Sequence, residues 1–339
     1  MHHYTMKRIF LGTVAFIGGV VLFGVLISYI GWHEVWASLQ TLSLFSIAVL
    51  FTTTAVFLAL GVFRWQYILK SQGYSLGFLQ LWKSFLSGFS LLFFIPIIPF
   101  ANEVFRGSVL RDKYNISFAR GMASVVIEHI LELTSTVVTV IAGGVIFLSI
   151  SNIPYSVKTL AVAAFIAVWF AAVAILYIRI FQKKTIVGFL GKKNGNVQEI
   201  EQEVFAFFRL DSRYFWQGVL LSLVRNMVAL ARVVAMLFFF GKGIALIPGI
   251  TILGFYYLAI LVPVPAALGS HDALQAAGFA AFGFGAGTGA AFALVVRAVE
   301  IAFAGAGLIY LVHHGLSVLG SLFIEKGTVL IRVVRGRDV

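Results

Sequence analysis

The strongest constraint on the fold is a set of long hydrophobic runs that contain no charged residue. A helix needs about 20 apolar residues to cross the hydrocarbon core of a bilayer. Such runs occupy residues 9–32, 35–63, 159–178, 243–270 and 273–296. The chain is 60% hydrophobic and 11% charged, with a mean hydropathy of +1.00, which excludes an ordinary soluble domain. The sequence therefore predicts an all-α, polytopic integral membrane protein.

Prolines and polar loops divide these runs into about six full spans and two broken segments. Full spans are expected at about 9–30, 43–66, 118–149, 157–180, 213–240 and 288–312. Two further apolar stretches, 77–114 and 243–286, are interrupted near the middle. The interruptions contain Pro96 and Pro99 in the first stretch, and Pro263 and Pro265 in the second.

The distribution of Lys and Arg predicts which ends of the segments face the cytoplasm, because positive charge favours that side. Residues 31–40 and 151–157 contain no Lys or Arg, whereas 179–209 is the most basic loop. The basic residues between 106 and 120 would face outward if 77–98 crossed the membrane. They stay inside if 77–114 is a re-entrant hairpin, and 243–286 then dips from the outer face. Ten ordinary helices with proline kinks remain the alternative.

The re-entrant plan predicts an internal repeat of opposite orientation. Each half has two spans, a proline-broken hairpin and a closing span, and three crossings per half invert the second half. Such inverted repeats are common in transporters. Repeat one covers about 9–150 and repeat two about 157–313, with a cytoplasmic loop at 179–212 that includes a short surface helix at 194–208. These form a membrane domain at 1–315, followed by a basic tail at 316–339 along the inner leaflet. Both termini are expected in the cytoplasm and the protein in the cell (plasma) membrane.

Charged and polar residues inside the apolar segments are the candidate functional residues, since a charge near the bilayer centre costs roughly 2.5–3.5 kcal/mol even on the mildest scale. Glu128 and Glu132 are four residues apart and share one helix face. We expect a lipid headgroup to be bound by residues drawn from this set: Asn102, Glu103, Arg106, Glu128, Glu132, Arg225, Arg232, Gly269, Ser270, His271, Asp272, Arg297 and Glu300.

One hypothesis gives these charges a structural role. Carboxylates of one half meet guanidinium groups of the other half across the repeat interface, and the ion pairs fix the register of the helices. On this hypothesis Arg106, which lies near the predicted cytoplasmic face, extends its charge to the membrane surface.

The other hypothesis gives the hairpin tips a binding role. Helix N-termini favour anions such as phosphate. Asn102 and Ser270 are candidate N-caps, and Arg297 or Arg106 is a candidate clamp for a phosphodiester. Glu103 and Asp272 have the alternative roles of capping the helices, orienting the arginines or carrying protons.

Two ordered motifs carry a family resemblance. The first is Pro-Phe-Ala-Asn-Glu-Val-Phe-Arg at 99–106, followed by Leu-Arg at 110–111 and Glu-His-Ile-Leu-Glu at 128–132. The second is Pro-Val-Pro-Ala-Ala-Leu-Gly-Ser-His-Asp at 263–272, followed by Arg297. Over about 9–315 the chain resembles the lysylphosphatidylglycerol synthase transmembrane region, also called the flippase-like domain family. Asn102 replaces the usual Gly, and His129 replaces the usual Arg. Glu132 stands where the family pattern has Asp, and Asp272 stands where it has Glu.

The resemblance implies a flippase-like transporter that moves an anionic phospholipid or a polyprenyl-phosphate-linked lipid between leaflets. The acyltransferase-like domain of some family members is not recognised, so no enzymatic activity is expected. Two alternatives remain open. One is a membrane scaffold or partner subunit of a separately encoded glycosyltransferase or lipid-modifying enzyme. The other is an intramembrane transferase acting on a lipid-linked substrate, with Glu103, Asp272 or His271 as base.

Expected partners are an anionic lipid headgroup and membrane lipids, with no nucleic acid, because Lys and Arg of a membrane protein mark its cytoplasmic loops. A homo-oligomer is compatible with the sequence. The chain contains no cysteine, which excludes thiolate metal sites and thiol nucleophiles. We expect no cofactor and no bound metal.

Overall fold

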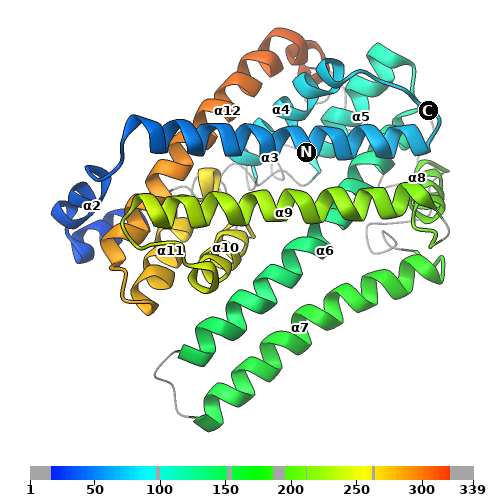
Figure 1. Ribbon diagram of the computed structural model, residues 1–339. Helices are drawn as coiled ribbons and strands as arrows, with labels where there is room; N and C mark the ends of the chain where they lie inside the picture. The colour runs from blue at the N-terminus through cyan, green and yellow to red at the C-terminus, as the bar shows by residue number, and fades with distance from the viewer. Residues whose placement is uncertain are drawn as a thin grey trace.

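The protein is built from helices, as the sequence predicts (Figure 1). The computed structural model describes residues 17–96, 100–150, 155–185, 195–210, 212–261 and 264–320, with the side chains of 155, 156, 158, 159, 162, 195, 196 and 313–320 left aside. The elements in these ranges are a first helix at Ile17–Ile30, α2 Trp32–Leu39, α3 Leu44–Ser71, α4 Phe78–Phe94, α5 Ala101–Tyr114, α6 Phe118–Ile150, α7 Tyr155–Phe181, α8 Gly195–Phe207, α9 Arg213–Phe239, α10 Leu246–Ile260, the 3-10 turn η2 Pro265–Ala267, α11 Ser270–Ala281 and α12 Ala286–Gly320. The basic tail from 321 onward lies outside the described residues.

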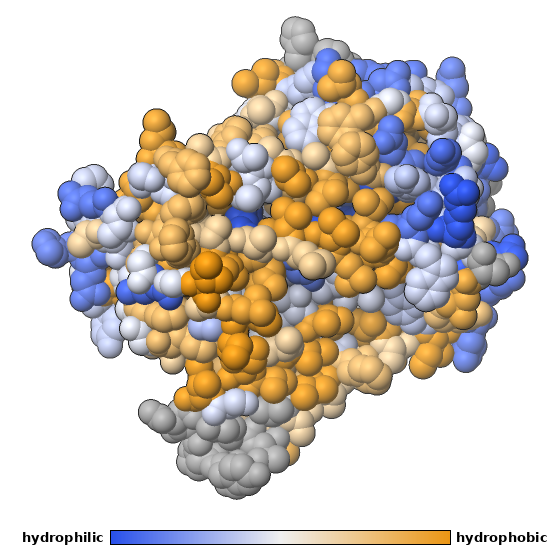
Figure 2. All heavy atoms as spheres, viewed as in Figure 1, coloured by the Kyte–Doolittle hydropathy of each residue, from blue (hydrophilic) through white to orange (hydrophobic). Residues whose placement is uncertain are grey.

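Five of the described helices, α3, α6, α7, α9 and α12, are long and apolar enough to cross a membrane. The first helix and α2 form a further candidate that bends by 87° at Gly31, whose positive φ of 89° suits a residue without a side chain. Figure 2 shows a broad hydrophobic band between hydrophilic ends, which lie at the α2 end and the α8 end of the molecule. The exposed apolar side chains and the helix lengths together define a polytopic membrane protein.

Helix α3 is longer than the predicted 43–66 span, and this matters for the site. It begins after Ser43, whose hydroxyl accepts a hydrogen bond of 3.2 Å from the Ser46 amide. It continues to Ser71 and is followed by Gly73 at a positive φ of 88°. Arg64 is therefore about two turns inside the helix rather than at its C-terminal end.

Both proline-containing stretches are broken, as predicted. Helix α4 ends at Phe94, and α5 begins after Phe100, which has a left-handed backbone at φ 61°. Helix α10 ends at Ile260, and η2 and Gly269, at φ 77°, precede α11. Pro96 and Pro265 lie in the breaks, while Pro99 and Pro263 lie outside the described residues. At about 1.5 Å per residue, each arm is shorter than the roughly 30 Å hydrocarbon core; the re-entrant topology itself stays a prediction.

Several helix contacts occur in corresponding pairs in the first and second halves of the chain. Helix α4 packs on α12 of the other half, and α10 packs on α6. Helices α3 and α9 pack on each other. Helix α2 packs on α12, and in the same way α8 packs on α6. In Figure 1, α10 and α11 lie toward the α2 end, whereas α4 and α5 lie toward the α8 end. The opposite orientation of the halves relative to a membrane remains a prediction.

The two equivalent interfaces are both formed by small residues, which allow helix backbones to approach closely in lipid. A Cβ added at Gly143 on α6 would lie 2.9 Å from the carbonyl oxygen of Ile250 on α10. A Cβ added at Gly307 on α12 would overlap the Leu86 carbonyl of α4. These contacts hold one arm of each broken segment against a spanning helix and so position the polar residues between them.

Candidate functional site

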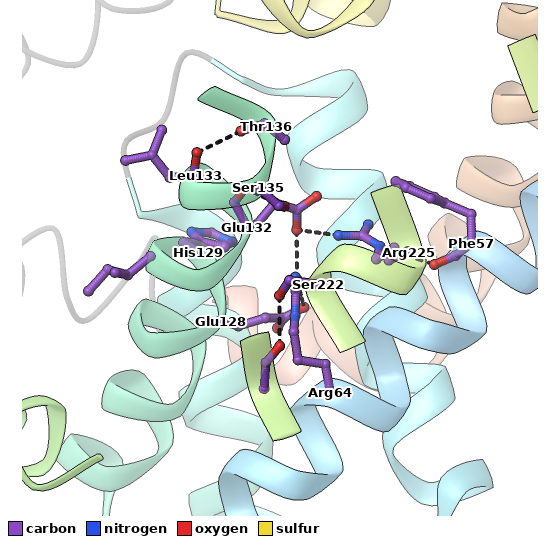
Figure 3. A network of polar contacts seen from close by, with 12 residues as sticks. Phe57, Arg64, Glu128, His129, Glu132, Leu133, Ser135, Thr136, Ser222 and Arg225 are labelled. Atoms are coloured by element: carbon purple, nitrogen blue, oxygen red, sulfur yellow. Dashed lines mark hydrogen bonds and ion pairs between the residues drawn. The ribbon is translucent and has the colours of Figure 1, made fainter. Parts of the chain in front are cut away.

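Arg64 on α3 is the centre of a buried polar network (Figure 3). Its Nη2 donates to Glu128 Oε1 at 3.1 Å and to Glu132 Oε2 at 2.7 Å, both on α6. Its Nη1 donates to Ser222 Oγ on α9 at 3.0 Å. The residue is 1% exposed. Sequence reasoning missed Arg64, because a cation near the end of an apolar run is normally a loop residue.

Arg106 on α5 is buried, so the prediction that it reaches the membrane surface is wrong. Its Nη2 donates to Glu128 Oε2 at 2.6 Å. Its guanidinium lies 3.7 Å from the centroid of the Trp65 ring and 5.0 Å from that of Phe85. The carboxylate and the two aromatic faces replace water as its neighbours.

Arg225 on α9 makes the ion pair between the two halves that the sequence predicts. It pairs with Glu132 Oε2 of α6 and donates from Nε to the Phe57 carbonyl at 3.1 Å (Figure 3). Its guanidinium also lies 3.9 Å from the centroid of the Phe57 ring. Glu132 thus joins α3, α6 and α9, and half-buried as it is, it lies at the edge of the buried cluster.

Two further residues of the first hairpin contact His129 of α6, which is next to Glu128 in the sequence. Its Nδ1 lies 2.9 Å from Glu103 Oε1, and its Nε2 lies 3.3 Å from Asn102 Nδ2. Asn102 is not the N-cap of α5, because Phe100 holds that position and Asn102 lies within the first turn. The predicted cap is therefore wrong, and the Asn102 amide is a buried partner of His129 instead.

A second cluster joins α9, α10 and α12. Arg232 Nη1 lies 3.7 Å from Glu300 Oε1 and 3.3 Å from Thr54 Oγ1. The Tyr256 hydroxyl donates to Glu300 Oε1 at 2.5 Å. Arg232 and Glu300 come from the same half, so this pair is not one of those expected between the halves.

At the second hairpin tip, Arg297 of α12 is held by an acid and by the chain turn. Its Nη2 donates to Asp272 Oδ2 at 2.6 Å, and its Nε donates to the Ala266 carbonyl at 3.1 Å. Asp272 Oδ2 also accepts the Gly269 amide at 2.9 Å. Asp272 therefore both caps α11 and orients the arginine, which are two of the three alternative roles predicted for it.

Gly269, and not Ser270, holds the N-cap position of α11. The Ser270 hydroxyl donates to the Ala267 carbonyl at 3.2 Å. The prediction that Ser270 caps the helix is wrong because the positive φ at the cap selects glycine. A Cβ on Gly269 would also meet the Gly19 carbonyl oxygen at 2.6 Å, so the first helix covers this tip.

Several buried polar atoms in the second cluster and at the tip lack a hydrogen-bond partner in the described residues. They are Arg232 Nε, His271 Nε2, Asp272 Oδ1 and Arg297 Nη1. Buried polar groups are almost always paired, with protein, water or a ligand. These atoms are therefore where a polar molecule would find both a donor and an acceptor.

The clusters form one continuous polar string. The Phe57 ring lies between Arg225 and Arg232, at 3.9 Å and 5.6 Å from their guanidinium carbons. The Tyr256 ring lies between Arg232 and His271, whose ring centroid is 5.2 Å away. The carboxylates and guanidinium groups along it balance: Glu103, Glu128, Glu132, Asp272 and Glu300 against Arg64, Arg106, Arg225, Arg232 and Arg297.

The fold and the site together define the class of protein: a polytopic helical membrane protein with two broken segments, whose interior charges are paired with one another. Comparison with protein families narrows this class. Residues 10–307 match the family described as the lysylphosphatidylglycerol synthase TM region, and the chain belongs to that family. No curated protein and no solved structure matches the chain. The membership gives the protein a membrane lipid-related function.

Proposed function

We propose that this protein is a flippase-like transporter that moves an anionic phospholipid or a polyprenyl-phosphate-linked lipid between leaflets of the cell membrane. Both termini face the cytoplasm in this proposal. Family membership supports the link to lipids. The buried polar string supports a path for a headgroup, since a charged group in bare hydrocarbon costs many kcal/mol.

One observation carries the proposal: Arg297 is buried and oriented, yet not saturated. Asp272 and the Ala266 carbonyl occupy Nη2 and Nε, while Nη1 has no partner among the described residues. A phosphodiester oxygen that accepts from Nη1 would meet a guanidinium whose orientation is already fixed. The entropy cost of ordering a long side chain is then avoided on binding.

The neutrality of the string suggests how a headgroup could pass along it. An interior with equal numbers of acids and arginines tolerates neither a large excess of cation nor of anion. A single negative headgroup that approaches Arg297 can weaken the Arg297–Asp272 pair while Asp272 retains the Gly269 amide. Breaking and remaking this pair is the step that we assign to headgroup passage.

The test is a liposome assay with labelled phosphatidylglycerol. Arg297→Gln removes the charge but keeps an amide donor, and we expect transport at least about tenfold slower, equivalent to the loss of roughly 1.4 kcal/mol of interaction. Arg111→Gln is the matched control, because Arg111 is exposed and its ion pair is with its exposed neighbour Asp112. Asp272→Asn/Arg297→Gln restores neutrality and so separates stability from transport. Wild-type protein no faster than empty liposomes, or Arg297→Gln as fast as wild type, overturns the proposal.

A scaffold for a glycosyltransferase or lipid-modifying enzyme is the second candidate. The observation that favours it is the pairing itself, since every carboxylate of the string has an arginine or histidine partner. On this alternative, the ion pairs fix the register of the helices and have no role in transport. Co-purification of one stoichiometric enzyme, together with unchanged lipid transport in Arg297→Gln, would favour this candidate over transport.

A further inference from the structure

A cavity of about 290 Å³ lies between α4, α5 and α12, apart from the polar string. Its lining includes Lys83 and Ser84 of α4, Lys113 and Tyr114 of α5, and Tyr310 of α12. Residues 83 and 84 lie in the first half of α4 and residues 113 and 114 at the end of α5. The cavity therefore opens at the base of the first hairpin, on the side that the positive-inside rule predicts to be cytoplasmic.

The charge of this cavity differs from that of the string. Two lysines line it and no carboxylate does. Lys83 Nζ lies 4.9 Å from the centroid of the Tyr310 ring. The nearby Asp112 is paired with Arg111 at 2.7 Å and is not part of the lining. The lining therefore carries an uncompensated positive charge, which an anion would balance.

The cavity also presents hydroxyl groups. Ser84 is 5% exposed, and its Oγ has no hydrogen-bond partner in the described residues. Its neighbour one turn on, Ser87, donates to the Gly307 carbonyl at 3.2 Å and so fixes α4 against α12. Burial raises the pKa of Tyr114, so its hydroxyl stays protonated and a donor at neutral pH. A hydroxyl that is buried beside two lysines and unpaired indicates a missing acceptor.

The rest of the lining includes apolar side chains that reach the lipid-facing surface. Phe105 and Val109 of α5 line the cavity beside the polar residues. Leu79 of α4, also in the lining, is 71% exposed. An acceptor group joined to hydrocarbon fits this combination, because its polar end meets Lys83 and Lys113 while its apolar end can follow Leu79 into the bilayer.

We propose that the cavity between α4, α5 and α12 binds the phosphate headgroup of an anionic lipid of the inner leaflet. Lys83 and Lys113 supply the charge, and Ser84 and Tyr114 donate hydrogen bonds to the phosphate oxygens. The inference rests on the proposed function in one respect: it gives the lipid a docking place before the headgroup reaches the polar string. Binding here can nevertheless be measured without transport.

The experiment is native mass spectrometry of the full-length protein in detergent, titrated with dioleoyl phosphatidylglycerol. Dioleoyl phosphatidylcholine is the zwitterionic control, and glycerol 3-phosphate tests whether a free phosphate occupies the same place. We expect Lys83→Gln/Lys113→Gln to weaken phosphatidylglycerol binding about 30-fold, since each lysine near an anionic headgroup contributes about fivefold. Phosphatidylcholine binding should stay unchanged.

The matched control is Lys70→Gln/Lys242→Gln, which removes the same charge outside the cavity lining. Ser84→Ala removes the buried hydroxyl without changing the charge or adding bulk, and we expect it to weaken phosphatidylglycerol binding several-fold. Equal losses in the two double variants mean non-specific attraction and overturn the proposal, as does normal binding by Lys83→Gln/Lys113→Gln. Glycerol 3-phosphate that binds as tightly as the lipid overturns the assignment to a membrane lipid.

The outcomes also separate this inference from the proposed transport. Phosphatidylglycerol binding that depends on Lys83 and Lys113, in a protein that moves no lipid in liposomes, supports the cavity and removes the transport proposal. Transport that depends on Arg297, in a protein whose double lysine variant binds lipid normally, supports the transport proposal and removes the cavity proposal.

Discussion

Glu128 is the residue whose neutralisation should cost the most stability. It is 2% exposed and accepts from Arg64 at 3.1 Å and from Arg106 at 2.6 Å. Glu128→Gln keeps the shape but leaves one arginine charge uncompensated. Arg64 retains Glu132 at 2.7 Å, so the unpaired cation is Arg106. Removing one partner of a buried pair costs about 3–5 kcal/mol, and we expect a loss of that size in the free energy of unfolding.

The assay is reversible unfolding in mixed micelles at increasing mole fraction of sodium dodecyl sulfate. Glu128→Gln/Arg106→Gln restores neutrality, so we expect it to cost about 0.5–3 kcal/mol less than the sum of the single variants. Asp112→Asn is the control, because its ion pair with Arg111 is exposed and should contribute under about 1 kcal/mol. If Glu128→Gln costs no more than Asp112→Asn, or if the double variant shows no coupling, the network is not a buried, interdependent unit.

The chain contains no cysteine, so single introduced cysteines give two further tests without background labelling. Gly19→Leu should push the first helix off the second hairpin tip, because a Cβ at position 19 would lie 2.7 Å from the Leu268 carbonyl oxygen. We therefore expect maleimide to label Leu268→Cys several-fold faster in the Gly19→Leu background. Gly24→Leu is the control and should leave the labelling rate unchanged, because a Cβ at position 24 would have nothing within 4 Å. A re-entrant first hairpin predicts that Phe100→Cys resists an impermeant maleimide added outside, while His33→Cys reacts; equal labelling of both would mean that α4 and α5 cross the bilayer completely.

The sequence alone reveals the class of protein and the places where its helices are broken. Runs without charge place the spans, and prolines at 96 and 265 mark breaks that the structure shows between α4 and α5 and before α11. The spacing of apolar residues at 194–208 predicts α8, found at Gly195–Phe207. These features are local, because helix length, hydropathy and backbone restriction depend on neighbouring residues in the chain.

The sequence also identifies most residues of the polar string, because a charged side chain inside an apolar run is conspicuous. It misses Arg64, which looks like a loop residue when α3 is expected to end near 66. Ser43 and Gly73 bound a longer helix, and its extra turns bring Arg64 into the bundle. Phe57 escapes attention for another reason: an aromatic ring in an apolar helix normally indicates contact with lipid or core, not with two arginines.

Only the tertiary structure decides which charge meets which. Glu132 meets Arg225 across the two halves, whereas Arg232 meets Glu300 within one half. Nothing in the local sequence distinguishes these cases, since each partner is many residues away and its position depends on which helices pack together. The chain therefore determines that its interior charges need partners, and the close packing of small residues between α6 and α10 and between α4 and α12 determines the partners they have.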